Sequence, residues 1–454
     1  MEGTAHGPDR VVRGEGPMIW LQLAIVLVFI VIGARMKGIG IGLAGGAGVI
    51  ALAATGMSVD PVKGIPWSVI GIIMPVVCAV SAMQVAGGMD HLVHLTEILL
   101  RRHPKQINYL GPLVSFVLTM LCGTGHTVYS VLPVIIEVAK EKHIRPSRPL
   151  SMSVIASQVA IVASPISAAT VAMVGILEPL GVGYLQVLAV SIPVTVIGCV
   201  AGILVASHQG RELDDDPVYQ QRKAAGLVAE PSATSESDYT PARGAVPSLL
   251  IFLTAIVIAV VYSALISPSM GIVRHAPMDS TGAIMTIMLL AAAIIVLVAR
   301  KPASQLTTQS TFHAGMTAAV CILGVAWLGN TFLTGHMTEI KQFGDVVQGS
   351  PWLLAVVFYF VAPLLFSHAA VTVALMPTAV QIGMSAAAML ACWPAVANYY
   401  LFPNYPTTVA AIEMDDTGST RIGSWVLNHP FVIPGTVSII VAVALGFLWA
   451  PVVV

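Results

Sequence analysis

The sequence predicts an all-α polytopic membrane protein, and three observations lead to this fold class. Apolar residues make up 56% of the 454 residues, whereas charged residues supply only 9%. A soluble domain usually contains about 25% charged residues, so a soluble globule of this length could not cover its surface. The apolar residues also gather in runs of about 20, the length that a helix needs to cross the hydrocarbon core. An ordinary cytosolic enzyme, a nucleic-acid-binding protein and a disordered chain are therefore excluded.

About ten apolar runs are candidate membrane-spanning helices. They lie near residues 18–34, 38–57, 65–87, 151–177, 183–207, 245–267, 281–300, 312–333, 390–414 and 430–452. Two further apolar regions, 107–140 and 351–389, each carry a polar break in the middle. Two full spans or one re-entrant hairpin fit each region, and either choice leaves the flanking loops on the same sides. We therefore expect about ten transmembrane helices plus two hairpin-like regions.

Lysine and arginine are distributed unequally between the two predicted sides of the membrane. Most of the 21 Lys and Arg residues, Arg35 among them, fall on one side. By the positive-inside rule that side is cytoplasmic, so both termini, including the short polar tail 1–17, are external. The polar stretch 208–244 is then a cytoplasmic linker. Its Pro, Ser, Asp and Glu content favours a flexible tether without a packed core.

The linker separates two halves, 18–207 and 245–454, that share features at a nearly constant spacing. The corresponding positions are Thr96 and Thr338, His126 and His368, Pro133 and Pro377, and Pro165 and Pro406. Each half holds an odd number of predicted spans plus one hairpin-like region, which inverts the second half relative to the first. We therefore expect two inverted repeats, an arrangement found in many secondary transporters.

Each half also contains one helix that the sequence breaks. Pro165 interrupts the run 151–177, and Pro406 interrupts the run 390–414, because proline lacks a backbone N–H. Gly123 permits a tight reversal in the first hairpin-like region. Non-helical backbone at membrane depth is tolerated only where it is buried in protein or lines a wet cavity. Half-helix N-termini there suit an anionic ligand, so the breaks are the predicted binding site.

Polar and flexible residues at these breaks make up the predicted substrate site. The predicted binding residues are Thr124, Gly125, His126, Thr127, Ser164, Pro165, Ser167, Ser367, His368, Thr372, Asn404, Pro406, Thr407 and Thr408. Ser and Thr are also common packing residues between membrane helices, so packing is the alternative explanation for any single hydroxyl. The matched positions of the two histidines favour a functional role for both.

A charged segment directly continues the second broken helix. Ionisable groups near membrane depth are costly and often functional. Arg421 could bind a substrate carboxylate through two parallel hydrogen bonds, and Asp415 or Asp416 could carry a proton or hold that arginine. The alternative is a cytoplasmic loop in which these residues cap helices.

Motifs for several other chemistries are missing from the sequence. It contains no P-loop, no H-E-x-x-H and no paired C-x-x-C motif, so we expect neither ATP hydrolysis nor a zinc site. The glycine-rich run 38–42 favours close helix approach over phosphate binding. We therefore expect no catalytic residue, no cofactor and no bound metal.

Specific strings of residues run through almost the whole chain. They are Gly33-Ala34-Arg35, Ala86-Gly87-Gly88-Met89-Asp90, Leu121-Cys122-Gly123-Thr124-Gly125-His126, Ile144-Arg145-Pro146-Ser147-Arg148-Pro149, Ala163-Ser164-Pro165, Met414-Asp415-Asp416-Thr417-Gly418 and Asn428-His429-Pro430-Phe431-Val432-Ile433-Pro434-Gly435. In these strings the sequence resembles the anaerobic C4-dicarboxylate transporters of the Dcu family, of the DcuA and DcuB type. The N-terminal tail and the linker are less similar.

The resemblance implies a multi-pass carrier of the bacterial inner membrane for fumarate, succinate, malate or aspartate. Such carriers exchange an external dicarboxylate for internal succinate, or take up dicarboxylate together with protons. The family is similar to the broader ion-transporter superfamily, which implies paired hairpins, broken helices and a homodimer. For some relatives the resemblance also implies a sensor kinase as a partner.

We therefore expect C4-dicarboxylate antiport by alternating access. Two alternatives stay open at this stage. One is a dicarboxylate-binding co-sensor, which would bind substrate without moving it. The other is a cation–proton antiporter on a similar scaffold, in which Asp415 or Asp416 would be essential.

Overall fold

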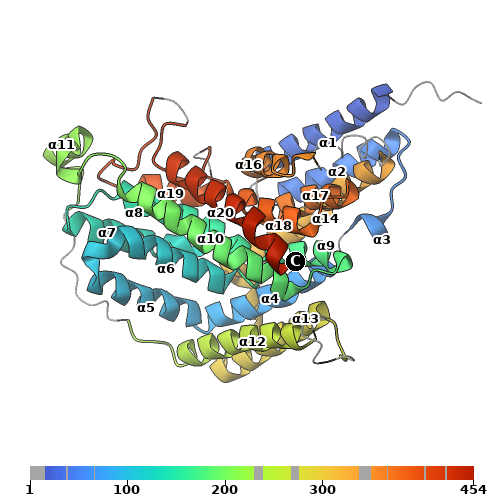
Figure 1. Cartoon of the computed structure of the whole chain (residues 1–454). Helices are drawn as coiled ribbons and strands as arrows, with labels where there is room; N and C mark the ends of the chain where they lie inside the picture. The colour runs from blue at the N-terminus through green and yellow to red at the C-terminus, as the bar shows by residue number, and fades with distance from the viewer. Residues whose placement is uncertain are drawn as a thin grey trace, which may run out of the picture.

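The computed structural model of the chain consists of helices and their connections, with no strand in the part of the chain that it describes (Figure 1). It describes residues 16–36, 39–65, 67–229, 239–266, 273, 276–336, 349–365, 367–402, 405–424 and 427–454. Over these residues the predicted all-α fold class is confirmed. The predicted external tail, 1–17, lies almost entirely outside the described residues.

The chain folds into α-helices, with short 3-10 helices between some of them. The first half contains α1 (Gly16–Met36), α2 (Gly40–Ala54), α3 (Pro61–Gly64), α4 (Trp67–Val85), α5 (Gly88–Arg102), η1 (Pro104–Gln106), α6 (Ile107–Cys122), η2 (Gly125–Ser130), α7 (Leu132–Glu141), α8 (Ser147–Ala163), α9 (Ala168–Leu177), η3 (Glu178–Leu180) and α10 (Tyr184–Ser207). The linker contains η4 (Leu213–Asp215) and α11 (Pro217–Ala224). The second half contains α12 (Ala245–Leu265), α13 (Ser280–Ala299), η5 (Ala303–Thr308), α14 (Ser310–Gly335), α16 (Leu353–Leu365), α17 (His368–Gln381), α18 (Ala386–Cys392), η6 (Trp393–Ala397), α19 (Pro406–Met414) and α20 (Val432–Val453).

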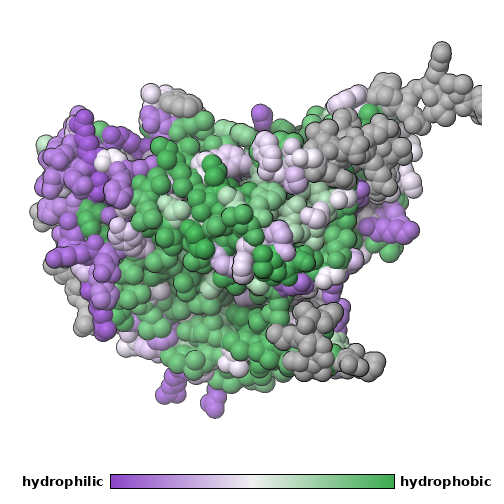
Figure 2. Space-filling view, viewed as in Figure 1, coloured by the Kyte–Doolittle hydropathy of each residue, from purple (hydrophilic) through white to green (hydrophobic). Residues whose placement is uncertain are grey.

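Six of the described helices are long and apolar enough to cross a membrane. They are Ser147–Leu180, Tyr184–Ser207, Ala245–Ser263, Thr281–Ala299, Thr311–Gly335 and Val432–Val453. A seventh span results if α4 and α5, which are bent by 68° at a short break, count as one. Within the described residues, shorter apolar helical stretches lie in α1, α2 and α16 and in the pair α18–η6. Figure 2 shows apolar residues over most of the face in view, with hydrophilic residues gathered at the end that carries α11.

The helices sort into two packed groups. In the first group α1 lies against α2, α2 against α14, and α4 and α12 against α13. In the second group α8 contacts α6, α10 and α19, and α20 contacts α10 and α18. Helices α9 and α17 lie against each other between the groups. Helix α9 contacts α4 on one side and α8 on the other, and α17 contacts α14 on one side and α18 on the other. We call these sets the first and the second helix group.

In the first hairpin-like region, α6–η2–α7, the chain reverses so that α7 lies beside the start of α6. Arg101, at the end of α5, donates from Nη2 to Glu137 Oε2 on α7 (2.9 Å). Near the start of α6, a Cβ added to Gly111 would lie 3.2 Å from Ile135 Cδ1 of α7. At the other end Gly123 ends α6 with a φ of 69°, in the left-handed region that glycine adopts without strain. The tip of this hairpin packs against the break after α8, where a Cβ added to Gly123 would lie 3.0 Å from Ile166 Cγ1.

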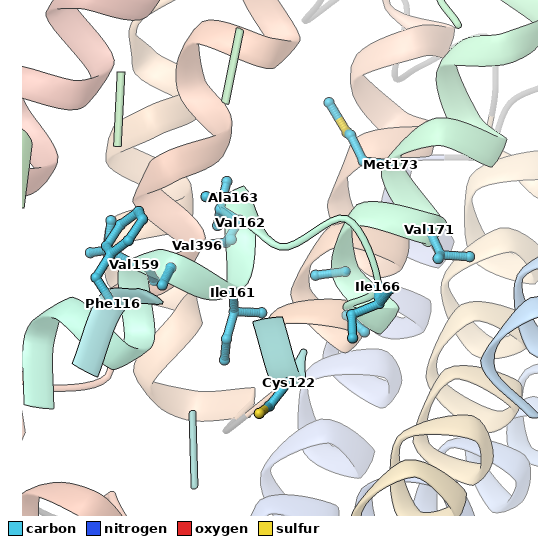
Figure 3. Close-up of a cluster of buried hydrophobic side chains, with 14 of the residues drawn as sticks. Phe116, Cys122, Val159, Ile161, Val162, Ala163, Ile166, Val171, Met173 and Val396 are labelled. Atoms are coloured by element: carbon cyan, nitrogen blue, oxygen red, sulfur yellow. The ribbon is translucent and has the colours of Figure 1, made fainter. Parts of the chain in front are cut away.

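The first broken helix is interrupted between α8 and α9, as Pro165 predicts. The Ser167 hydroxyl accepts a hydrogen bond from the Thr170 backbone N–H (3.1 Å) and so caps α9. The Ser164 hydroxyl donates to the Met120 carbonyl (2.8 Å), which ties the break to the end of α6. Figure 3 shows this loop surrounded by apolar side chains from α6, α8 and α9. Hydrogen bonding thus satisfies the interrupted backbone within an apolar interior.

The first part of the linker is folded, in contrast to the flexible tether that its composition suggests. Leu213 is fully buried, and Tyr219 of α11 is 7% exposed. Asp216 caps α11 by accepting from the Val218 N–H (2.9 Å), and its carboxylate pairs with Arg145 (Nη1–Oδ2 2.6 Å). Composition could not predict this docking, because the partners lie far away in the sequence.

Glycines on α2 allow α14 to approach closely. A Cβ added to Gly42 would lie 2.2 Å from the Val320 carbonyl oxygen, and one added to Gly45 would lie 2.5 Å from the Gly324 carbonyl carbon. Gly46, on the same helix, would meet nothing within 4 Å. The close helix approach predicted from the glycine-rich run is therefore confirmed at its described end.

Gly45→Ala should destabilise the protein by about 1–3 kcal/mol, because the new methyl group would overlap the backbone of α14. Gly46→Ala adds the same methyl group to open space. It should leave stability unchanged or raise it by about 0.5–1 kcal/mol, since glycine weakens a helix interior. Thermal unfolding of both purified variants in detergent checks this. Equal melting temperatures would contradict the close packing of α2 on α14.

Candidate functional site

One large cavity lies where the interrupted segments of both halves meet. Its volume is about 1060 Å³, and α1, α4 and α14 of the first helix group form part of its wall. The hairpin tip, both broken helices and the junction of α16 and α17 form the rest. Predicted binding residues in the lining are Thr124, Gly125, His126, Ser367, His368 and Pro406. Asn404, which was also predicted, lies outside the described residues.

Three helices begin at the cavity wall. They are α9, α17 and α19, and the first residues of each line the cavity. These lining residues are Ala168, Ala169, Ser367, His368, Tyr405 and Pro406. The first N–H groups of a helix have no partner within the helix and lie at the positive end of its dipole. The cavity therefore offers hydrogen-bond donors and partial positive charge to an anion.

The two matched histidines line the cavity in different ways. His126 is exposed and stacks on Tyr129, with ring centroids 5.8 Å apart and an interplanar angle of 4°. His368 is only 5% exposed, and its Nε2 donates to the Gln158 carbonyl (2.9 Å). Its ring also packs on Tyr399, at a centroid distance of 4.4 Å. His368 is therefore fixed within the wall, whereas His126 is accessible to a ligand.

The remaining predicted residues of the first half lie behind the wall. Thr127 donates from its hydroxyl to a carbonyl of the hairpin tip (3.1 Å). Ser164 and Ser167 are fully or almost fully buried and donate to carbonyls at the ends of α6 and α8. The Pro165 carbonyl accepts a hydrogen bond from the Tyr184 hydroxyl. These residues hold the two breaks in position and do not line the cavity.

Their counterparts in the second half have the same placement. The Thr372 hydroxyl accepts from the Trp393 indole N–H (3.0 Å). The Thr407 hydroxyl accepts from the Gln158 side-chain amide (3.4 Å), which joins α19 to α8. Thr408 is fully buried, and its hydroxyl has no hydrogen-bond partner within the described part of the chain. None of these three residues lines the cavity.

Sequence reasoning missed the wall that the first helix group contributes. Thr311 and Thr317 of α14 line the cavity, and Thr311 donates to the Gln84 side-chain oxygen (2.6 Å). Arg35 of α1 lines it too, although the sequence suggested only a boundary cation. Among the described lining residues Arg35 is the only arginine or lysine, and no carboxylate joins it. The one available signal was that Arg35 belongs to a family-like string.

The family of the chain follows from comparison with known sequences. The model of a family described as "Anaerobic c4-dicarboxylate membrane transporter", DcuA_DcuB, matches residues 18–454. The chain belongs to the DcuA/DcuB family. The predicted resemblance is therefore confirmed, and the chain is a member of a membrane-transporter family and not an enzyme.

Relatives in this family match the chain over almost its whole length. The C4-dicarboxylate transporter DcuA of Wolinella succinogenes is 47% identical over 96% of this chain and 100% of its own. DcuA of Escherichia coli K12 is 48% identical over 95% of this chain and 99% of its own. The anaerobic C4-dicarboxylate transporter DcuB of Escherichia coli O6:H1 is 35% identical over 95% and 98%.

A solved membrane-transporter structure has a similar fold. The crystal structure of the YdaH transporter of Alcanivorax borkumensis matches 96% of this chain and 98% of its own, with a TM-score of 0.55. The two sequences are 14% identical, so the likeness concerns the fold alone. The DcuA/DcuB-family chain is thus a multi-pass membrane protein with a fold already seen in a transporter.

The charged segment after α19 does not line the cavity of this DcuA/DcuB-family chain. Asp415 is 4% exposed and accepts hydrogen bonds from the loop that follows it. The donors are the Thr417 N–H (3.1 Å) and hydroxyl (2.5 Å), the Ser419 hydroxyl (2.7 Å) and the Thr420 N–H (2.7 Å). Its carboxylate therefore organises this loop.

Asp416 joins the two halves of the chain through the linker. Its Oδ2 lies 2.9 Å from Lys140 Nζ at the end of α7 and accepts from the Ala229 N–H of the linker (2.9 Å). Its carbonyl accepts from Arg222 Nε of α11 (2.8 Å). We call this set of contacts, together with the Asp216 pairs described next, the linker clamp.

Asp216 of the linker is the second centre of the clamp. Its carboxylate lies 2.6 Å from Arg145 Nη1 and 3.4 Å from Arg421 Nη1. Burial alone would raise the pKa of Asp216, but the Val218 N–H and the two guanidinium groups outweigh it and lower that pKa. The stabilisation is therefore present at neutral pH and disappears only as the pH falls through this lowered pKa. Arg421 thus contacts the linker and not the cavity.

Asp416→Asn should release the linker, because the amide cannot hold the Lys140 ammonium group as an ion pair. Trypsin should then cleave at Arg222 and Lys223 about fivefold faster, if the lost interaction is worth about 1 kcal/mol. Timed digestion of the purified protein in detergent, followed on gels, measures this rate.

Asp214→Asn is the matched control for the clamp. Asp214 is an exposed linker carboxylate that lies 3.1 Å from His143 and does not contact Asp416 or Asp216. Its substitution should leave the cleavage rate unchanged. Equal acceleration in both variants would show that Asp416 has no special role in holding the linker.

Proposed function

We propose that the chain exchanges C4-dicarboxylates, such as fumarate, succinate, malate and aspartate, by alternating access. The observation that carries this proposal is the meeting of three helix N-termini and one arginine at a single cavity. A dicarboxylate dianion faces a prohibitive desolvation cost in hydrocarbon. Backbone donors, helix dipoles and a guanidinium group can replace its water of hydration. The names of the relatives support C4-dicarboxylates as the substrate class.

The two helix groups supply the moving parts that alternating access needs. The cavity lies between them, so a displacement of one group relative to the other would change which side it opens to. We propose that the second group, with the hairpin tip and both breaks, carries the substrate past the first group. An empty carrier that reorients poorly and a loaded carrier that reorients well would give exchange.

We infer that the halves 18–207 and 245–454 are inverted repeats of about five spans and one hairpin each. Reciprocal contacts support this inference, because α2 of the first half lies against α14 of the second, and α13 of the second lies against α4 of the first. In the same way α1 lies against α2 as α12 lies against α13. Two repeats related by a pseudo-two-fold axis produce such exchanged pairs.

We propose the bacterial inner membrane as the location, with both termini external and the linker 208–244 cytoplasmic. The linker clamp supports one common side for the linker and the basic loops, since Lys140, Arg145 and Arg148 all contact this region. The hydrophilic end in Figure 2 is the end that carries α11. The positive-inside rule makes that end cytoplasmic.

Two other functions remain as competitors of exchange. A co-sensor would bind dicarboxylate without moving it. A cation–proton antiporter would need a titratable carboxylate at the cavity, but Asp415 and Asp416 contact the loop and the linker instead. The position of these carboxylates favours the dicarboxylate carrier.

Proteoliposomes that hold the purified chain and labelled succinate should release the label faster when unlabelled fumarate is added outside. We expect this acceleration because the cavity should close only when a bound dianion and the positive groups of the wall neutralise each other. Equal efflux with and without external fumarate would indicate a channel or uniporter. Binding of succinate without any flux would indicate a co-sensor.

His126→Ala should strongly reduce this exchange, by about tenfold or more, because an exposed ring in the cavity wall would no longer meet the anion. His103→Ala is the matched control, since His103 is exposed at the end of α5 and does not line the cavity. Initial exchange rates per reconstituted protein measure the effect. Unchanged exchange in His126→Ala would remove this residue from the site.

A further inference from the structure

We propose that Arg35 binds one carboxylate of the substrate directly and thereby makes transport both dianion-selective and exchange-coupled. The proposal rests on the proposed function, because it names a further substrate contact in the same cavity. Neither the predicted binding residues nor the predicted charge-pairing residues include Arg35. The argument has three parts, namely the position of Arg35, its charge and the energetic consequence of both.

Arg35 lies on the face of α1 that forms part of the cavity wall. Val31 and Arg35 are four residues apart in α1 and lie on the same side of the helix. Ile30, Val31 and Arg35 all line the cavity. The Arg35 side chain is exposed, so its guanidinium group is accessible to a ligand in the cavity.

The guanidinium group of Arg35 differs from those of several other arginines in having no ion-pair partner among the described residues. Arg101 pairs with glutamates of α5 and α7, Arg145 pairs with Asp216, and Arg148 pairs with Glu212. Within the described residues no hydrogen bond or ion pair joins Arg35 to another side chain. A charge beside apolar walls is costly unless an anion compensates it. In this proposal the ligand supplies that anion.

The chemistry of a guanidinium group fits a carboxylate. Its planar fork of N–H donors can form two parallel hydrogen bonds with both oxygens. The part of the cavity wall that α4 contributes is apolar and includes Ile73, Val76 and Val77. The dielectric constant in the cavity is therefore lower than in water, which strengthens the attraction between a guanidinium group and a carboxylate. No described lining residue is a lysine or another arginine, so the second carboxylate must find neutral donors.

Those neutral donors lie on other elements of the cavity wall. The N-termini of α9, α17 and α19 reach it from the broken helices and from the junction of α16 and α17. A four-carbon diacid has two carboxylates at opposite ends. We therefore assign one carboxylate to Arg35 of the first helix group and the other to these helix N-termini together with His126 of the hairpin tip. Bound in this way, the substrate connects the two helix groups.

Exchange follows from this arrangement. Closing the empty cavity would enclose an uncompensated guanidinium group between apolar walls, which is unfavourable. A bound dianion compensates Arg35 with one carboxylate and keeps the other for the helix N-termini. The loaded carrier can therefore close and reorient, whereas the empty carrier cannot. A monocarboxylate would occupy only one of these two carboxylate-binding positions.

Arg35→Gln should raise the KM for succinate in proteoliposomes by about tenfold or more, because it removes a charge-assisted contact. The same variant should lose its preference for succinate over the monocarboxylate butyrate. Its efflux without external substrate should also approach its exchange rate, since the empty cavity no longer contains a charge. Arg35→Lys keeps the charge without the planar fork and should give intermediate values.

Arg102→Gln is the matched control, because Arg102 is exposed at the end of α5 and does not line the cavity. It should keep the wild-type KM, selectivity and coupling. If Arg35→Gln proves unfolded by size-exclusion chromatography, the KM of folded Arg35→Lys decides. Wild-type KM and wild-type selectivity in folded Arg35 variants would overturn this proposal and leave the proposed function intact. Absence of succinate exchange in the unsubstituted chain would instead overturn the proposed function.

Discussion

Backbone groups at helix breaks must find hydrogen bonds inside the protein, because hydrocarbon offers none. This constraint determines how the centre of the molecule is built. Ser164 and Ser167 satisfy carbonyls at the ends of α6 and α8, and Ser167 also caps α9. The breaks can exist at this depth only because other segments surround them. The helix ends that remain directed at the cavity are the groups that an anionic ligand can satisfy.

The same constraint explains the small number of charges and their placement. Ion pairs gather at the hydrophilic end, in the linker clamp. There Lys140 of the first half pairs directly with Asp416 of the second, and Asp216 of the linker joins Arg145 to Arg421. By contrast, Arg35 is the only lysine or arginine among the described residues that line the cavity. A carrier for a dianion needs this balance, since many fixed cations would hold the substrate too firmly to release it.

In the proposed mechanism the substrate also has a structural role, because it binds between the two helix groups. The wall from α1, α4 and α14 belongs to the first helix group, and the hairpin tip and breaks belong mainly to the second. A ligand that contacts both bodies stabilises their closed arrangement by its differential affinity for it. In the proposed alternating-access mechanism, coupling of binding to movement would need no separate signal, only a ligand long enough to reach both walls.

The sequence by itself determined the membrane-protein class, the positions of the breaks and the family. These depend on composition and on the local chemistry of proline and glycine, which act within a few residues. Only the tertiary structure decided that Arg35 lines the cavity, that Thr372 and Thr407 lie behind its wall, and that Asp415 organises a loop. Each of these roles is set by contacts between segments that are distant in the chain. Spacing within one segment carries no information about such contacts.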